Sequence, residues 1–236
     1  MIDKLIKEKL VTAKAVLRFE KAKRTAADTV TVYDDHGNAA HQFEHLRQQS
    51  DKVTGKPKYS LADFISPNGN DYLGGFTVSI FGAEKLANEY KAKGDDYNAI
   101  MVQAVCDRFA ESFAEKLHEL VRKEYWGYQA GENLSNEELI REKYVGIRPA
   151  PGYLACPEHT EKGKLFDWLD TTNAIGAYLT ESFAMWPPSS VSGFYYSHPD
   201  STYFNVGKIS TDQLEDYARR KGWDIKTAEK WLNPNL

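Results

Sequence analysis

The chain has 236 residues, 42% of them hydrophobic and 27% charged, with a formal net charge of −4. This composition is typical of an ordinary globular protein, and the slight excess of acidic residues gives no electrostatic footprint for nucleic acid. No apolar run approaches the ~18 residues of a membrane-spanning helix, and the charged N-terminal stretch lacks the apolar core of a signal peptide.

The first part of the chain predicts one long helix followed by antiparallel β structure. Apolar residues at three- and four-residue spacing favour the helix, whereas alternation around the turn His36-Gly37-Asn38 is typical of a hairpin. The pair Gly74-Gly75 within a β-rich segment indicates a bulge or a close backbone approach. In chain order, the expected elements are a helix over 2–22, a hairpin over 29–46, and β segments over 59–65 and 72–82.

The rest of the chain predicts helices, then strands, then helices again. The longest helix is expected from an apolar stripe that runs from Ile100 to Val121. Ser135 followed by Glu138 is a capping box, which begins a short helix. The expected helices cover 83–92, 95–125, 136–144, 162–169, 210–222 and 228–232, and the expected strands cover 177–185, 191–199 and 202–209.

Helices and strands come in blocks rather than in strict alternation. This order argues for an α+β fold with a mostly antiparallel sheet, and against a doubly wound parallel sheet. No linker-like stretch divides the sequence, so we predict one domain spanning residues 1–236.

A stripe of polar residues follows one face of the longest predicted helix. Its members recur at three- and four-residue steps and are Arg108, Glu111, Glu115, His118 and Arg122. Such stripes are usually solvated, so this face is expected to be exposed. Glu111 would be the exception if its end of the helix lies under another element.

The segment 147–162 contains three prolines and a glycine, and it is expected to be a stiff, irregular loop. It presents Arg148 and Tyr153 five residues apart, and Glu142 lies six residues before Arg148. A braced loop with an arginine and an aromatic residue favours a binding surface. A buried crossover with Arg148 in a structural ion pair fits the residues equally well.

The cysteine and histidine residues suggest little chemistry. Cys106 and Cys156 are too few for a disulfide framework and favour a reducing, cytoplasmic location. Cys156 and His159 are spaced like half of a metal site, or like a thiol nucleophile with its base. The pattern supplies neither the further metal ligands nor an orienting third group, so a metal site and a thiol hydrolase are both disfavoured.

The segment 180–209 is unusually aromatic, and Pro187-Pro188 interrupts it. Aromatic strands usually belong to a core. Tyrosines beside an arginine loop also suit a small ligand with a flat ring and a carboxylate. No glycine-rich phosphate-binding motif is present, so a nucleoside bound here is expected to lack a polyphosphate.

Several long motifs, in the expected order, strongly resemble the C-terminal activation domain of cobalamin-dependent methionine synthase. They are VRKEYWGY, ENLSNEELIREKY, RPAPGY followed by CPEHTEK, LTESFAMWPPSSVSGFYYSHPDS, EDYARRKG and the terminal KWLNPNL. The resemblance covers nearly the whole chain and is weakest around 25–60. It implies a C-shaped or helmet-like α+β domain, with a twisted antiparallel sheet and long flanking helices, that binds S-adenosylmethionine in a shallow groove.

The resemblance also implies a repair function within a methyltransferase. The cobalamin of that enzyme occasionally oxidises to inactive cob(II)alamin. Flavodoxin or an equivalent reductase then supplies an electron, and S-adenosylmethionine supplies a methyl group. The domain would cap the cobalamin-binding domain during this step, so cobalamin is contacted here but bound elsewhere. The chain alone is not expected to make methionine.

The family motif R-x-x-x-G-Y falls on Arg148, Gly152 and Tyr153. By resemblance, Arg148 pairs with the methionyl carboxylate, backbone groups near Gly152 hold the nucleoside, and acidic residues face the ligand's cationic groups. The resemblance assigns no catalytic residue and no metal ligand. The implied ligand-binding residues are Glu111, Glu142, Arg148, Ala150, Gly152, Tyr153, Tyr203 and Phe204.

One departure from the family pattern concerns an N-terminal D-W-x-P-F-F-like segment, whose aspartate contacts S-adenosylmethionine. This sequence begins inside the family's domain and has no such segment. We therefore expect weak or absent affinity for the nucleoside. The alternative function is a non-catalytic docking module for a cobalamin-binding domain or flavodoxin.

Overall fold

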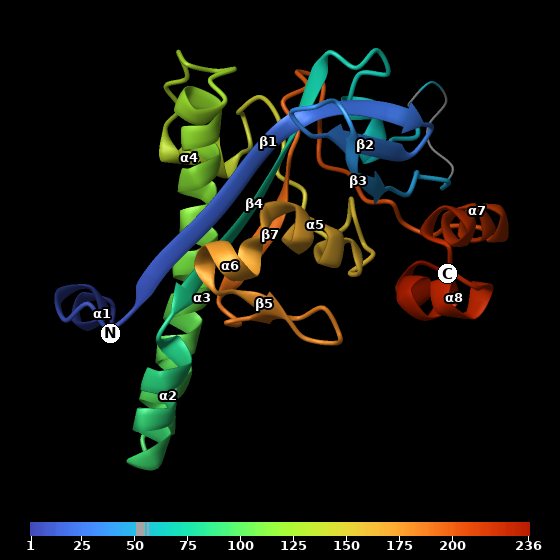
Figure 1. The fold of residues 1–236 in the computed structure, drawn as a ribbon. Helices are drawn as coiled ribbons and strands as arrows, with labels where there is room; N and C mark the ends of the chain where they lie inside the picture. The colour runs from blue at the N-terminus through green and yellow to red at the C-terminus, as the bar shows by residue number, and fades with distance from the viewer. Residues whose placement is uncertain (51–54, 56) are drawn as a thin grey trace.

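The computed structural model describes residues 1–50, 55 and 57–236. Its centre is a five-stranded antiparallel sheet with the strand order β3-β2-β1-β4-β7, which twists across the molecule (Figure 1). The strands of the sheet are β1 (Thr12–Ala26), β2 (Thr29–Tyr33), β3 (Ala39–Glu44), β4 (Asp71–Phe81) and β7 (Ser190–Tyr195), and a separate hairpin pairs β5 (Tyr178–Leu179) with β6 (Met185–Trp186). The predicted α+β fold with an antiparallel sheet is confirmed.

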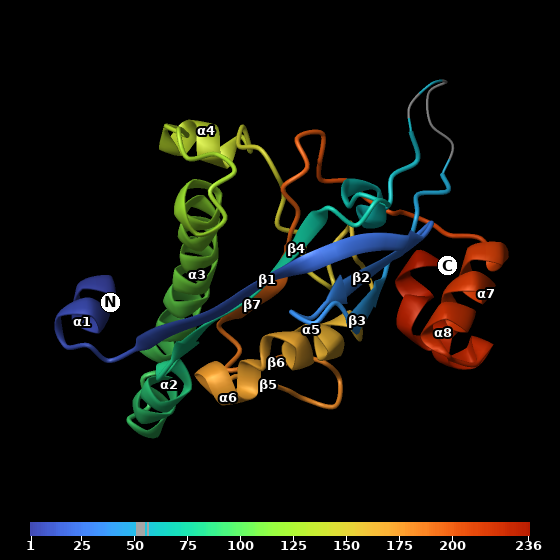
Figure 2. The same ribbon diagram turned by 45° about the horizontal axis from the view of Figure 1, so that its top comes forward.

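The helices cover both faces of this sheet. They are α1 (Ile2–Lys7), α2 (Ala83–Ala92), α3 (Asp96–Leu120), α4 (Asn136–Ile140), α5 (Glu161–Leu169), α6 (Thr171–Ile175), α7 (Thr211–Lys221) and α8 (Ile225–Leu232), with single turns η1 (Leu61–Phe64), η2 (Val121–Tyr125) and η3 (Asn233–Asn235). Along β4, Phe76 and Val78 pack toward α3, whereas Leu73 packs toward α5. Figure 2 shows α3 and α5 on different sides of the strands, with α7 and α8 beyond β3. None of the described helices combines the length and apolar character needed to cross a membrane.

The N-terminal segment differs from the sequence-based expectation. Only α1 is helical, and β1 replaces the rest of the helix predicted over 2–22. β1 pairs with β4 along eleven successive residue pairs, from Thr12 opposite Phe81 to Ala22 opposite Asp71. The prediction was wrong because a central strand buries apolar residues on both faces, and Val16 and Leu17 accordingly pack into different clusters. Apolar residues that point to both faces of a strand can have the same spacing as those on one face of a helix, so the sequence alone did not distinguish the two.

Two further predicted β segments, 59–65 and 202–209, are wrong, and a third, 177–185, is only partly β. Residues 59–65 contain the turn η1, where the backbone amide of Ser60 donates to the Asp63 carboxylate at 2.9 Å. Residues 202–209 are irregular, and over 177–185 only the ends of the segment pair, as β5 and β6. The hairpin over 29–46, the strand over 72–82 and the helices at 83–92, 162–169 and 210–222 are confirmed to within a few residues.

Gly74 and Gly75 allow close packing on both faces of β4 without a bulge. Their register with β1 and β7 is continuous. A Cβ atom on Gly75 would lie 2.5 Å from Cζ3 of Trp168, and one on Gly74 would lie 2.9 Å from the ring of Phe19. Of the two predicted alternatives, the close approach is confirmed, and it lets α5 seat Trp168 directly on the sheet.

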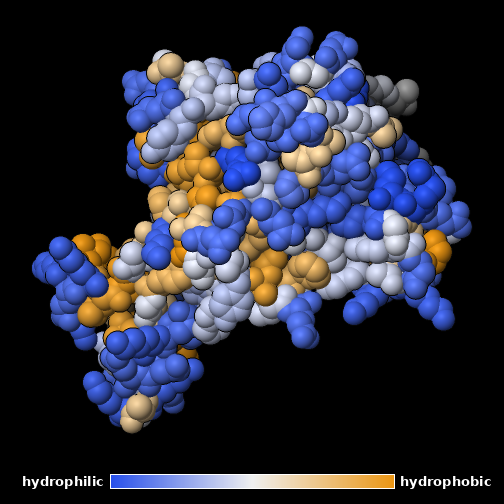
Figure 3. Space-filling view, in the orientation of Figure 1, coloured by the Kyte–Doolittle hydropathy of each residue, from blue (hydrophilic) through white to orange (hydrophobic). Residues whose placement is uncertain are grey.

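The buried face of α3 matches the predicted apolar stripe at its C-terminal end, where Leu117 and Val121 are buried, but not along its N-terminal half. Ile100 is 65% exposed, and the residues that face the sheet are mostly small: Ala99, Val102, Cys106, Ala110 and Ala114. Small side chains bring the helix axis close to the strands. The large apolar residues that the stripe counted lie to the side, where Phe109 and Phe113 join a shallow hollow with Leu5 and Val11. Apolar surface beside α1 and along α3 is visible there in Figure 3.

Candidate functional site

The segment 147–162, called the proline-braced loop below, lies against strand β7 and the residue after it. Ile147 and Tyr196 exchange backbone hydrogen bonds of 2.9 and 3.0 Å, and the amide of Phe194 donates to the carbonyl of Pro149 at 2.9 Å. The loop therefore continues the sheet by one irregular strand. Because these hydrogen bonds flank Arg148, they fix its position along β7.

Gly152 closes the loop into a tight turn. Its amide donates to the carbonyl of Cys156 at 2.7 Å, and its φ of +98° lies in the region that favours glycine. A Cβ atom here would lie 2.3 Å from Cε1 of His159. The stiffness predicted from the sequence thus comes from hydrogen bonds and packing as well as from the prolines.

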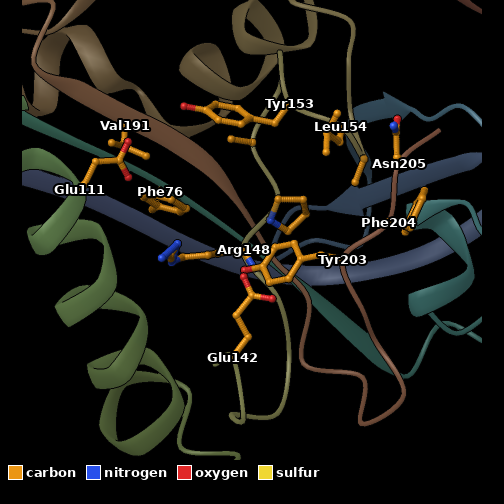
Figure 4. Close-up of a pocket in the computed structure, with 13 residues that line it drawn as sticks. Phe76, Glu111, Glu142, Arg148, Tyr153, Leu154, Val191, Tyr203, Phe204 and Asn205 are labelled. Atoms are coloured by element: carbon orange, nitrogen blue, oxygen red, sulfur yellow. The ribbon is translucent and has the colours of Figure 1, made fainter. Parts of the chain in front are cut away.

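A cavity of about 510 Å³ opens between this loop, α3 and the segment after β7 (Figure 4). Such a volume is ordinary for a site that takes a small molecule, roughly 300–1,000 Å³. Seven of the eight residues expected to bind the ligand line it, namely Glu111, Glu142, Arg148, Ala150, Tyr153, Tyr203 and Phe204. The eighth, Gly152, does not line this cavity but shapes the turn beside it. Residues far apart in the sequence therefore converge as the motifs imply.

Arg148 is held at the floor of the cavity. Its Nη2 is ion-paired with Glu115 of α3, and its backbone amide donates to Oη of Tyr203 at 3.0 Å. Burial opposes the charge of Arg148, but Glu115, together with Tyr203 and Tyr144, outweighs that effect and raises the pKa of the guanidinium. Its Nε atom is buried and has no partner among the described residues. The guanidinium is thus oriented by the protein and keeps an unused donor.

Two glutamates stand at opposite sides of Arg148. Glu111 projects from α3 beside Val191, and Glu142 approaches Tyr203 from the loop after α4 (Figure 4). Both are exposed, and neither side chain has a hydrogen bond or ion pair among the described residues. Free carboxylates on either side of an arginine suit a ligand that carries both positive and negative groups.

The aromatic residues divide into anchored and free rings. Tyr203 accepts the Arg148 amide bond and lies 3.4 Å from the hydroxyl of Tyr144. Phe204 packs against Tyr59, with ring centroids 5.9 Å apart. Tyr153 is 64% exposed at the mouth of the cavity, so its face is available for stacking.

Three neighbouring aromatic residues of the segment 180–209 belong to the core, whereas Trp186 is 42% exposed. Phe194, Tyr195 and Tyr196 on and after β7 are fully buried. Of the aromatic residues in this segment, Tyr203 and Phe204, beyond the strand, line the cavity. The segment is therefore divided between the core and the wall of the cavity.

Cys156 and His159 do not form a reactive pair. Burial raises the pKa of the Cys156 thiol well above its ordinary value, which disfavours a thiolate. His159 is exposed, and its ring packs on Gly152. Over residues 1–50, 55 and 57–236, no group of three or more His, Cys, Asp or Glu side chains could hold a metal ion.

The polar stripe on α3 was expected to be solvated, and for its C-terminal half that expectation is wrong. His118 is buried between the rings of Tyr195 and Tyr144, at centroid distances of 5.2 and 5.0 Å. Arg122 is fully buried and makes two hydrogen bonds to Glu132, at 2.6 and 2.7 Å. Sequence reasoning also missed the pairing of Glu115 with Arg148. The four-residue step from Glu111 to Glu115 could have indicated it, because both lie on the face that meets the loop.

Comparisons with known proteins bear on the family and on the fold as a whole. A family model described as the vitamin B12-dependent methionine synthase activation domain matches residues 1–222. The crystal structure of the MetH reactivation domain bound to AdoHcy superimposes with a TM-score of 0.95 and 52% sequence identity. That match covers 100% of this chain and 74% of the other.

Proposed function

This chain belongs to the family of activation domains of vitamin B12-dependent methionine synthase, and we propose that its cavity binds S-adenosylmethionine for reductive reactivation of that enzyme. The family resemblance inferred from the motifs is confirmed. The observation that carries the proposal is the convergence of seven expected binding residues on one cavity around an oriented arginine. The related reactivation domain binds AdoHcy, the product left when S-adenosylmethionine loses its methyl group.

The charges in the cavity match those of the proposed ligand. The guanidinium of Arg148 would receive the methionyl carboxylate through donors that Glu115 leaves free. Glu111 and Glu142 would face the ammonium and sulfonium groups, since both carboxylates line the cavity without partners among the described residues. Tyr153 would cover the adenine ring.

Methyl transfer from a sulfonium needs no general acid or base. The chemistry supplied by the proposed partners is one electron from flavodoxin or an equivalent reductase and a cobalt nucleophile from cobalamin on another domain. This chain's residues would contribute positioning: they would fix the carboxylate and the nucleoside so that the methyl group points out of the cavity in line with the incoming nucleophile. No residue here is proposed to act as a catalyst.

The rim of the cavity is a candidate contact for the cobalamin-binding domain. Tyr153 and Leu154 are each 64% exposed there. Adjacent exposed apolar side chains beside a ligand site favour contact with another surface. A cytoplasmic location fits the two free, buried cysteines, and we propose that residues 1–236 act as one unit. The expectation of weakened nucleoside affinity stays a prediction.

Reactivation by the assembled methionine synthase tests the proposal. The Arg148→Met variant should lose reactivation driven by S-adenosylmethionine and a reductant, while turnover of enzyme that is already methylated stays at the parent rate. Arg108→Met is the control, because Arg108 is an exposed arginine of α3 outside the cavity. Normal reactivation by Arg148→Met would reject a nucleoside site that depends on Arg148.

A further inference from the structure

A second cavity, of about 410 Å³, lies beside the first. The two share Ala150, Tyr153 and Val191 as a common wall. The remaining walls come from the start of α5, from β7 and from the loop that joins β5 to β6. The residues that line only the second cavity are Pro151, His159, Lys162, Ser182, Phe183, Ala184, Met185, Pro188, Ser190 and Ser192.

Lys162, in the first turn of α5, faces this cavity without a direct ion-pair partner among the described residues. It is 6% exposed, and its ammonium has no hydrogen bond or ion pair among the described residues. Burial accordingly lowers the pKa of Lys162. The nearby Glu158 is already engaged by Lys221, at 3.1 Å, and by Thr160. The side chain is thus largely covered by protein while its unpaired ammonium opens into the cavity, where it could meet an anionic ligand.

Lys221 provides an internal comparison. This second buried lysine is paired with Glu158 and Glu161, and it also donates to Thr160 at 2.9 Å. Its neighbouring carboxylates outweigh burial and raise the pKa of its ammonium. The fold thus neutralises the buried lysine that faces protein and leaves unpaired the one that faces the cavity.

Ser192 supplies a second unused donor to the same cavity. Its Oγ atom is buried and has no partner among the described residues. Ser190, two residues earlier on the same face of β7, instead donates to the carbonyl of Pro187 at 2.6 Å. Aspartate and glutamate are absent from the described residues that line the cavity. The polar groups that line it include the ammonium of Lys162, the hydroxyl of Ser192, the ring of His159 and the phenol of Tyr153, and no acid among them would repel an anion.

The outer wall of the cavity is anchored rather than loose. Phe183, in the loop between β5 and β6, packs against α5 at Gly163, where a Cβ atom would meet its ring at 3.0 Å. Its other side contacts Trp231 edge to face, at a centroid distance of 5.3 Å. Contacts on two sides of the Phe183 ring thus fix this loop, which lines the same cavity as Lys162.

We propose that the second cavity is an oxyanion site, in which Lys162 and Ser192 bind a carboxylate or phosphate group. This site is separate from the nucleoside cavity. The proposal does not depend on whether the first cavity binds S-adenosylmethionine. Because the two cavities share the Tyr153 wall, an anionic group of a second molecule would sit directly beside the methyl donor.

Two-dimensional NMR of this chain, titrated with inorganic phosphate and separately with acetate, tests the proposal. Amides near Lys162 and Ser192 should shift in a saturable way, with sodium chloride at matched ionic strength as the blank. Saturation by phosphate or by acetate identifies which anion class the site takes. Loss of one charge-assisted contact in Lys162→Met should weaken binding about tenfold or more, and Ser192→Ala should weaken it less.

Lys85→Met is the matched control, because Lys85 is an exposed lysine of α2 outside both cavities; it should bind like the parent chain. Three results would each overturn the proposal: shifts equal to those from sodium chloride, unchanged affinity in both Lys162→Met and Ser192→Ala, or loss of the shifts after saturation with S-adenosylhomocysteine. The last would mean that the two cavities form a single site. A failure of S-adenosylhomocysteine to bind at all would count only against the nucleoside site.

Discussion

The backbone amide of Arg148 donates a 3.0 Å hydrogen bond to the phenolic oxygen of Tyr203, 55 residues further along the chain. This bond joins the proline-braced loop to the irregular segment after β7, and both line the same cavity. The residue proposed to bind the ligand's carboxylate is thus positioned through its main chain by one of the aromatic residues of the site.

Tyr203→Phe should therefore affect both stability and binding. The substitution leaves the Arg148 amide without its acceptor, which costs about 1–3 kcal/mol for a buried donor. Urea unfolding should show a loss in that range, and calorimetry should show weaker binding of S-adenosylhomocysteine. Tyr97→Phe is the control, because Tyr97 is 71% exposed. Equal stability of the two variants would show that the hydrogen bond does not hold the loop.

Glu132→Gln should strongly destabilise the region behind the cavity. Arg122 is fully buried, and Glu132 neutralises it through two hydrogen bonds. Removing one partner of such a pair costs about 3–5 kcal/mol, because the remaining charge stays buried.

Glu119→Gln is the matched control for this pair. Glu119 bonds to surface Lys116 and Lys123, and pairs of that kind contribute about 0–1 kcal/mol. Thermal and urea unfolding of both variants measures the contrast. Similar losses would contradict the assignment of Arg122 and Glu132 as a buried structural pair.

Gly152→Ala should destabilise the binding loop. The φ of +98° disfavours any side chain, and the added methyl would collide with the His159 ring, 2.3 Å away. We expect a cost of about 1–3 kcal/mol, together with reduced nucleoside affinity. Gly131→Ala should be harmless in the same assays, because Gly131 has an ordinary φ and a Cβ atom there would have no neighbour within 4 Å. A Gly152→Ala variant with parent stability would contradict the tight-turn assignment.

Stability should fall as the pH is lowered below 6.5. Complete burial lowers the pKa of His45 to about 3, and burial also lowers the pKa of His118 well below its ordinary value. Between pH 3 and 6.5, the unfolded chain binds protons at these positions that the folded chain excludes. His45 should thus contribute a loss of ~2 kcal/mol between pH 7.5 and pH 5, and none above its unfolded pKa.

Histidine resonances followed by NMR from pH 7.5 to pH 4.5 check this sign. The His45 and His118 signals should stay constant while the protein is folded, whereas exposed His36 provides a reference on the hairpin turn. Titration of His45 near pH 6.5 in the folded state would contradict its burial as a neutral ring.

Local chemistry explains which elements could be predicted from the sequence. The hairpin over 29–46 and the start of α4 at Ser135 depend on turn and capping residues that act within a few positions. β1 depends instead on β4, about 59 residues away at the Leu17–Phe76 pair. Its apolar residues fit a helix equally well until the partner strand is known.

The sequence predicted the cavity residues that belong to long motifs. It did not predict the residues whose burial depends on contacts with distant parts of the chain. The R-x-x-x-G-Y motif and the downstream aromatic pair located the central residues of the cavity and the turn by resemblance. The burial of His118 and Arg122 depends on Tyr144 and Glu132, which come from loops after α3. Residue spacing on one helix contains no information about such loops. The unpaired Lys162 likewise becomes apparent only when its neighbours' partners are known.

Calorimetric titration of this chain with S-adenosylhomocysteine is the most direct test of the proposed nucleoside site. We predict saturable binding of one ligand per chain, weaker than micromolar, that disappears in Arg148→Met and persists in Arg108→Met. Equal binding by the parent chain and Arg148→Met would contradict the site, and micromolar or tighter binding by the parent chain would contradict the expected weakening.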